Sequence, residues 1–132
     1  WNLPMFTADQ LVAHAVGDYV LQSEWMATEK TKRSLAALVH CLVYTLPFLF
    51  LTQNPYTLAV IAGTHFVIDR WHLARYVAWI KNRPWPGSAP WSECRETGFN
   101  PKTQPWLAGW LVIIIDNVMH VTTNALALHY LG

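Results

Sequence analysis

Apolar residues recur along this chain in four long stretches, at about residues 7–30, 33–51, 56–83 and 105–131. In the first stretch they recur at intervals typical of a helix and do not alternate as in a half-buried strand: Leu11, Val12, Val16, Tyr19, Val20 and Met26. Thr7 or Asp9 is placed to cap its start. The pattern predicts an all-α protein of four helices. A length of 132 residues predicts a single helical domain over residues 1–132.

The second, third and fourth stretches are long enough to cross a bilayer. Residues 34–51 (SLAALVHCLVYTLPFLFL) carry no charged side chain, and about 18 apolar residues are just enough to span the hydrocarbon core. The whole chain is 53% hydrophobic and 13% charged, about half the charged fraction of an ordinary soluble domain. The sequence therefore predicts an integral membrane four-helix bundle embedded in the lipid bilayer. The first helix is the most polar of the four and is expected either to bury one face against its neighbours or to lie partly in the membrane interface.

Basic residues are concentrated in two of the three connections: Lys30, Lys32 and Arg33 in the first, and Lys81, Arg83, Arg95 and Lys102 in the third. The middle turn, residues 52–56, has no charge. By the positive-inside bias both basic loops face the cytoplasm and both termini face outward. A net charge of +1 is too small to indicate nucleic acid as a partner.

The third connection, residues 84–105, is rich in Pro, Gly and Trp and is far longer than most helical connections. Such a loop is either a functional cover or a flexible tether. The tryptophans around it are typical of an aromatic belt at the membrane surface, with a substrate-binding patch as the alternative: Trp79, Trp85, Trp91, Trp106 and Trp110.

Three of the helices carry a histidine and an aspartate four residues apart: His14 with Asp18, His65 with Asp69, and Asp116 with His120. Side chains at that spacing lie about 40° apart around a helix and roughly 6 Å apart along it, so both can address one point. With His40 on the second helix, the sequence offers seven candidate ligands or proton carriers.

The depths of these pairs agree. Asp18 and Asp69 lie roughly 18 Å from the cytoplasmic ends of their helices, and Asp116 lies roughly 17 Å beyond Pro105. The fourth helix runs outward and has aspartate before histidine, the reverse of the first and third. The topology therefore predicts one layer of histidines and one of aspartates.

Ionisable groups at this depth are costly, at about 2.5 to 3.5 kcal/mol each on insertion scales. A divalent cation would offset their charge and use imidazole and carboxylate as ligands. Zinc is the first choice, and Fe²⁺ and Mn²⁺ suit the same donors. Seven candidate ligands would also be enough for two ions. The alternatives are a hydrogen-bonded network that fixes helix packing, and a path for protons or cations.

The stretch HAVGDYVLQSEWMATEK, residues 14–30, resembles the opening signature of a family of small integral membrane proteins of uncharacterised function found in bacteria and phages. His40, the HFVID stretch at residues 65–69 and the DNVMH stretch at residues 116–120 extend the likeness over nearly the whole chain. The resemblance implies a multi-pass protein of the bacterial inner membrane or of a phage-associated membrane. The chain also has a looser likeness to membrane-bound metal-dependent hydrolases, whose histidines and aspartates lie in membrane helices, and no substrate follows from it.

The leading hypothesis is a membrane metalloprotein whose divalent metal site draws its ligands from His14, Asp18, His40, His65, Asp69, Asp116 and His120. In a hydrolase, Asp18 or Asp69 would accept a proton from water, and the 84–105 loop would serve as a lid. The first alternative is a non-catalytic accessory protein whose polar layer holds together the bundle, a homo-oligomer or a larger membrane complex. The second is a proton or cation conductor.

Overall fold

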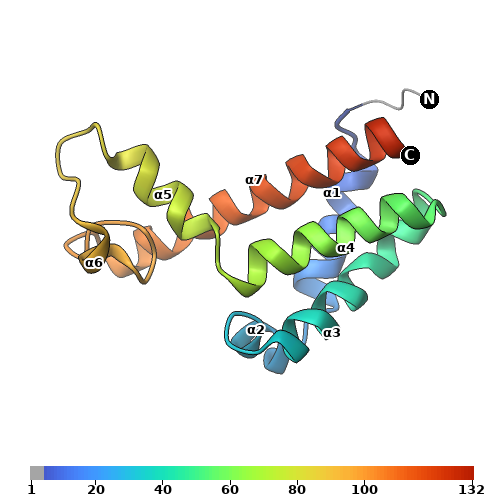
Figure 1. The fold of residues 1–132 in the computed structure, drawn as a ribbon, viewed down its shortest axis with the longest axis horizontal. Helices are drawn as coiled ribbons and strands as arrows, with labels where there is room; N and C mark the ends of the chain where they lie inside the picture. The colour runs from blue at the N-terminus through green and yellow to red at the C-terminus, as the bar shows by residue number, and fades with distance from the viewer. Residues whose placement is uncertain (1–4) are drawn as a thin grey trace. The chain divides into compact units, whose positions relative to one another are not determined.

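The computed structural model describes residues 5–132, and all regular structure in that range is helical (Figure 1). The elements in chain order are α1 (Ala8–Ala15), η1 (Val16–Val20), α2 (Glu24–Glu29), α3 (Ser34–Thr45), η2 (Leu46–Phe50), α4 (Pro55–Arg70), α5 (Ala74–Asn82), α6 (Trp91–Cys94) and α7 (Pro105–Leu131). The predicted all-α class is therefore confirmed. The fourth predicted helix is α7, with the predicted bounds.

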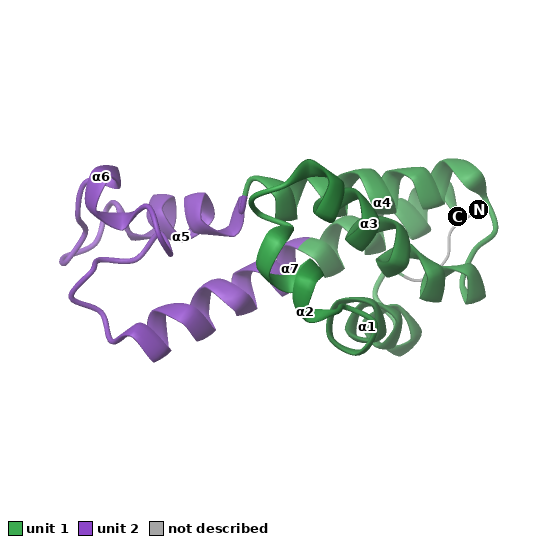
Figure 2. Cartoon of the chain, turned by 90° about the horizontal axis from the view of Figure 1, so that it is seen from below, with its two compact units in different colours: residues 1–71, 120–132 green, residues 72–119 purple. Residues whose placement is uncertain are grey.

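The chain divides into two compact units (Figure 2). The first comprises residues 1–71 and 120–132, and the second comprises residues 72–119. The helix α7 contributes its first part to the second unit and its last part to the first unit.

The first predicted helix, residues 7–30, is not continuous, and that part of the prediction is wrong. Thr7 caps α1 as expected, its side chain accepting a hydrogen bond from the backbone N–H of Gln10. The chain then widens into the π-helix η1, and the backbone N–H of Leu21 donates to the carbonyl of Val16 at 2.9 Å. Ser23 caps a new helix, α2, by accepting from the N–H of Met26. Serine competes for backbone hydrogen bonds and so favours a cap over a helix interior.

The third predicted helix is also interrupted. The helix α4 ends at Arg70 and α5 begins at Ala74, and between them His72 has a φ of 48°. A residue in this left-handed region cannot continue a right-handed helix. Near Pro47, where a kink is predicted, the second predicted helix changes type. Pro47 opens the tighter 3₁₀ segment η2 at the end of α3, because proline has no N–H for the helical ladder.

The first unit has a small apolar core and a close contact between its first two long segments. Tyr44, Phe48, Ile61 and Leu128 are fully buried in this core. Gly17 lies against α3, where an added Cβ would come within 2.6 Å of Tyr44 Cδ2 and 2.8 Å of the Tyr44 carbonyl oxygen. Glycine at this position therefore allows η1 and α3 to pack closely.

Substituting Gly17→Ala is expected to lower the free energy of unfolding by about 1 to 3 kcal/mol, because overpacking forces the backbone apart. The matched control is Gly63→Ala in α4, where an added Cβ would meet nothing within 4 Å. That control should gain up to about 1 kcal/mol, because alanine is the better helix former. Chemical denaturation of both variants measures the difference. Equal effects of the two substitutions would contradict the close packing at Gly17.

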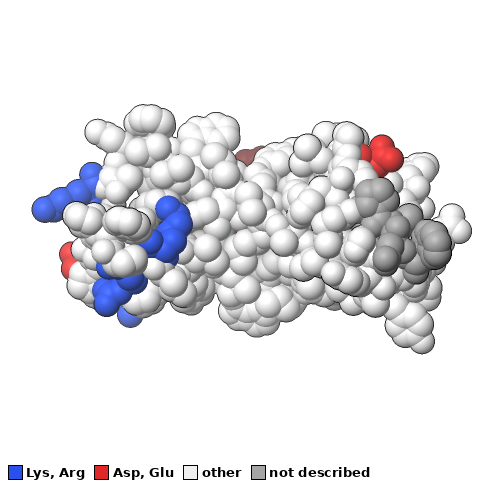
Figure 3. Space-filling view, turned by 90° about the horizontal axis from the view of Figure 1, so that it is seen from above, with Lys and Arg blue, Asp and Glu red and all other residues white. Residues whose placement is uncertain are grey.

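The first unit reverses the usual distribution of polar and apolar residues. Its buried residues include Gln10, His14, Asp18, His40, Thr57, His65, Asp69, His120 and Asn124. Leucines on α3 and η2 are exposed, and Phe50 is 94% exposed. Much of the molecular face in Figure 3 carries no charged side chain. Polar side chains thus lie inside this unit, beneath an apolar exterior.

Among the described residues, one helix is both long and apolar enough to cross a membrane. This helix is α7, which has 27 residues. Its most apolar 18-residue stretch has a mean hydropathy of 1.5, and 33% of that stretch is buried. The segment Ser34–Phe50 is apolar but shorter. One such helix also occurs in the cores of soluble proteins. Length and composition therefore support one candidate span, whereas four membrane helices were predicted.

The second unit is held together by α5, the long loop and the first part of α7. Ala74 and Ala78 of α5 are fully buried and pack with Phe99, Ala108 and Val112. The loop contains the short helix α6. Much of the loop predicted as a lid or tether is therefore folded into a unit with its own core.

Candidate metal centre

Four ionisable side chains of the first unit converge on one point. Asp18 is on η1, His40 is on α3, and His65 and Asp69 lie one turn apart on α4. All four are buried, none more than 4% exposed. One donor atom from each lies within 4.8 Å of all the others. Three segments distant in sequence thus supply one cluster of two imidazoles and two carboxylates.

The distances within the cluster are short. His65 Nε2 lies 2.8 Å from both His40 Nε2 and Asp69 Oδ2. His40 Nε2 lies 3.0 Å from Asp18 Oδ1 and 3.2 Å from Asp69 Oδ2. The distance from His65 Nε2 to Asp18 Oδ1 is 3.6 Å. A tetrahedron of donors at zinc bond lengths has edges of about 3.3 to 3.6 Å, so the two 2.8 Å distances would lengthen by about 0.5 Å or more around an ion.

Hydrogen bonds alone do not satisfy these two histidines. An imidazole Nε2 carries at most one hydrogen, yet Nε2 of His40 and Nε2 of His65 each face two carboxylate oxygens and the other ring. The Nδ1 atoms of both rings are buried, and neither has a hydrogen-bond partner within residues 5–132. Lone pairs that converge in this way match the donor set of a bound cation. The residues present therefore fit a divalent metal ion.

Lys30 adds one positive charge beside the two carboxylates of the cluster. This role was not singled out in the sequence analysis. Its Nζ lies 3.2 Å from Asp69 Oδ2 and 4.0 Å from Asp18 Oδ1. The Lys30 side chain is 16% exposed and is the most accessible charged group beside the two carboxylates. Arg70 braces the connection between α2 and α3, because its guanidinium donates to the carbonyl of Thr31 at 2.9 Å and to Ser34 Oγ at 3.2 Å.

His120 of α7 supports the cluster from outside. Its Nε2 lies 3.0 Å from Asp69 Oδ1, the carboxylate oxygen that faces away from His40 and His65. Its ring also stacks on His65, with the ring centres 4.1 Å apart. Hydrogen bonds of this kind orient the ligands of metal sites and tune their basicity.

Tyr44 forms a second support. Its ring stacks on His65 at 3.7 Å between ring centres. Its hydroxyl accepts a hydrogen bond from Asn124 Nδ2 at 2.7 Å and lies 2.7 Å from His14 Nδ1. Because the hydroxyl accepts from Asn124, its own hydrogen is available to His14. Nε2 of His14 then faces Asp18 Oδ2, 3.9 Å away.

The sequence reasoning missed Tyr44 and Asn124, but a signal for both was present. Tyr44 is four residues after His40 on α3, and Asn124 is four residues after His120 on α7. This is the same spacing that identified the His and Asp pairs. Extending the search to tyrosine and asparagine would have found both residues.

The structure brings four of the seven predicted ligands into one cluster: Asp18, His40, His65 and Asp69. His14 and His120 contact other members of the same polar core. Asp116 is half-buried on the part of α7 that belongs to the second unit. The ligand roles of these residues, and proton transfer by Asp18 or Asp69, stay predictions.

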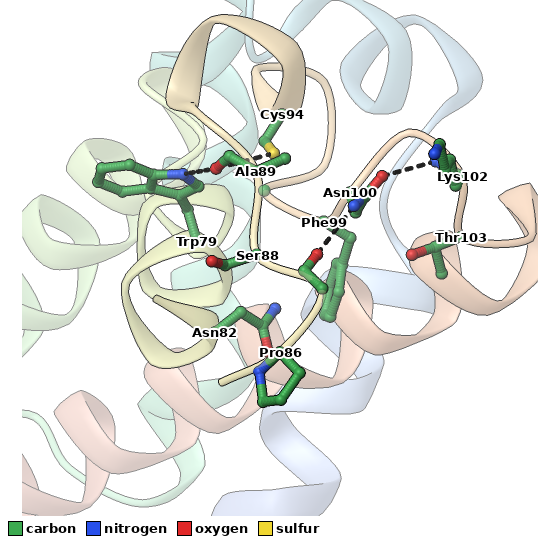
Figure 4. A pocket seen from close by; sticks show the side chains of 12 residues that line it. Trp79, Asn82, Pro86, Ser88, Ala89, Cys94, Phe99, Asn100, Lys102 and Thr103 are labelled. Carbon is green, nitrogen blue, oxygen red and sulfur yellow. Dashed lines mark hydrogen bonds between the residues drawn. The ribbon is translucent and has the colours of Figure 1, made fainter. Parts of the chain in front are cut away.

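The second unit contains a different candidate, a pocket of about 370 Å³ under the long loop (Figure 4). Its polar groups are largely used to brace the loop. Trp79 Nε1 donates to the carbonyl of Ala89, and Asn100 bridges the carbonyl of Gly87 and the backbone N–H of Lys102. Lys102 is the one charged residue in its lining. We therefore place the metal chemistry in the first unit.

Comparison with curated proteins and with solved structures gives no match. The membrane placement, the phage or bacterial origin and the likeness to hydrolases stay predictions of the sequence. Comparison with protein families gives a match over nearly the whole chain. The family described as "Protein of unknown function (DUF3307)" matches residues 6–131, and the chain belongs to this family.

Proposed function

We propose that this chain is a membrane protein that binds a divalent cation through Asp18, His40, His65 and Asp69. The convergence of two Nε2 atoms and two carboxylate oxygens carries the proposal: the nitrogens lie 2.8 to 3.6 Å from the oxygens and from each other, and all four donors lie within 4.8 Å of one another. The two carboxylates bring a charge of −2 into a buried site, and Lys30 offsets only part of it. With Lys30 the net charge is −1, and a divalent ion would more than offset it, to +1.

Zinc suits this donor set best. It accepts imidazole nitrogen and carboxylate oxygen in a tetrahedral arrangement, whereas magnesium and calcium prefer oxygen ligands. Fe²⁺ and Mn²⁺ also accept imidazole and carboxylate ligands, so this donor set favours zinc over them less strongly than over magnesium and calcium. Four protein ligands would close the coordination sphere, which is typical of a structural ion. Such an ion would join η1, α3 and α4, three elements that come from separate parts of the chain.

Metal-dependent hydrolysis of a membrane-accessible substrate is the second candidate, and the position of Lys30 favours it. A partly exposed ammonium beside the ligands is suited to stabilise negative charge that develops on a substrate. When bound, zinc supplies a water of lowered pKa and a Lewis acid. Hydrolysis needs one carboxylate to remain unligated, so that Asp18 or Asp69 can accept the proton from water.

The distribution of residues in the first unit supports the membrane placement. Buried polar side chains beneath an exposed apolar exterior are typical of proteins whose surroundings are lipid. The leucines of α3 and η2 and the exposed apolar side chains of α7 would then face acyl chains. In this proposal α3, α4 and α7 are the membrane-embedded helices of a multi-pass protein.

Elemental analysis of the purified chain tests the metal site, and we expect about one equivalent of bound zinc per chain for the four-donor cluster. A chain free of metal and of unchanged stability would contradict it. Cobalt substitution then separates the structural from the hydrolytic role. A visible spectrum that changes when azide is added indicates an open ligand position, as hydrolysis requires. An unchanged spectrum makes the ion structural.

A further inference from the structure

We propose that the second unit docks on a membrane surface rich in anionic lipid headgroups, through α5 and the loop that follows it. Residues 74–104 contain five basic and two acidic side chains, a formal charge of 5 − 2 = +3. The basic residues are Arg75, Lys81, Arg83, Arg95 and Lys102, and the acidic ones are Glu93 and Glu96. In Figure 3 the blue Lys and Arg side chains gather over this unit.

The outward face of α5 is apolar and aromatic. Its small residues Ala74 and Ala78 face inward and are fully buried. On the other side of the helix, Tyr76 is exposed and Ile80 is 62% exposed. If the outward face of α5 were in contact with water, polar residues would be expected there. A face that combines isoleucine, tyrosine and basic residues is typical of a helix lying in the membrane interface.

One exposed tryptophan follows α5 closely in the chain, and two others lie elsewhere in the same unit. Trp85, three residues after the end of α5, is 67% exposed. Trp106 and Trp110 are also exposed, on the side of α7 opposite Ala108 and Val112, which pack with α5. The amphipathic indole ring is enriched at the level of lipid headgroups. Trp79 and Trp91, by contrast, are half-buried and pack against one another, with ring centres 5.7 Å apart. The predicted aromatic belt thus divides into an exposed group and a structural pair.

The basic side chains are held near aromatic rings. Arg75 lies over Tyr76 at 5.0 Å and over Trp91 at 5.5 Å. Arg83 lies 4.9 Å from the centre of the Trp79 ring. Arg75 is half-buried and donates to the Arg95 carbonyl at 2.9 Å, whereas Arg83 is exposed. Stacking keeps the Arg83 cation at the surface beside the apolar side chains. Lipid phosphates complement such a surface, because they offer negative charge directly above an apolar layer. This argument uses only the second unit and does not rest on the metal site.

A fluorescent probe at position 80 tests the docking in the full chain. The Ile80→Cys variant is labelled with an environment-sensitive dye and reconstituted into vesicles of phosphatidylcholine, with or without phosphatidylglycerol. Cys41 and Cys94 are buried, and burial raises the pKa of the Cys94 thiol. The parent chain, treated identically, measures background labelling. We expect a blue shift and quenching by lipids brominated near the headgroup, stronger with phosphatidylglycerol and weakened by salt.

Two neighbouring charges provide a matched pair of controls. Arg95→Gln should lower the ratio of docked to undocked probe about fivefold, and Glu96→Gln should raise it, because both side chains are exposed. Equal quenching with and without phosphatidylglycerol would overturn the proposal, as would identical responses of the two variants. Metal content is measured on the same samples. Loss of docking with metal retained would reject this inference alone, whereas docking without metal would reject only the proposed function.

Discussion

Replacing Asp69 by alanine is expected to abolish cation binding and to lower the free energy of unfolding by about 3 to 5 kcal/mol. Asp69 is central to the site, because its Oδ2 faces His40, His65 and Lys30 while its Oδ1 meets His120. Removing its carboxylate takes away the acidic oxygen that lies 3.2 Å from the Lys30 ammonium and leaves Asp18 Oδ1 at 4.0 Å. Elemental analysis measures the first effect and denaturation in detergent measures the second.

The control for Asp69→Ala is Asp9→Ala, which removes the same charge from an exposed position in the same unit. Loss of an acidic residue from the first turn of α1 should cost at most about 1 kcal/mol and leave the metal content unchanged. If Asp69→Ala does not fold, Asp69→Asn keeps the shape of the side chain and should still lose metal. A folded Asp69 variant that retains a full equivalent of ion would contradict the ligand assignment.

Part of the candidate site was predictable from the sequence because helical spacing places i and i+4 side chains on one face regardless of the tertiary fold. The pair of His65 and Asp69 on α4 behaves in this way, and the two side chains meet at 2.8 Å. His14 and Asp18 share the spacing, but η1 intervenes and their nearest atoms are 3.9 Å apart. Residues of one uninterrupted helix were therefore placed better than residues that straddle a change of helix type.

The interruptions themselves were not predictable from hydrophobic pattern. The pattern of residues 56–83 reads as one helix, yet His72 takes a left-handed conformation. Histidine is neither glycine nor proline, so no breaker signal marks the position. Similarly, Gly17 gives little local warning of the π-helix, whose packing against Tyr44 is a long-range contact. Tertiary packing overrides local propensity at both positions.

A chelator is expected to lower the thermal midpoint of the native chain by on the order of 10 °C. An ion that binds only the folded state stabilises it by about 4 kcal/mol when its free concentration is a thousandfold above the dissociation constant. Without the ion, Asp18 and Asp69 would keep two negative charges in one buried cluster, beside the Lys30 ammonium. Thermal unfolding, followed by circular dichroism with and without chelator, measures the difference.

The competing explanation is a metal-free network in which a protonated histidine balances the second carboxylate. Chelation would then leave the midpoint unchanged, because no ion is withdrawn. Asp69→Ala serves as the internal control, since a chain that has lost the site should not respond to chelator at all. Added zinc should restore the native midpoint, whereas magnesium should not, because magnesium prefers oxygen ligands in an octahedral arrangement. Recovery with zinc alone would therefore assign the stabilisation to a site that needs His40 and His65 as nitrogen donors.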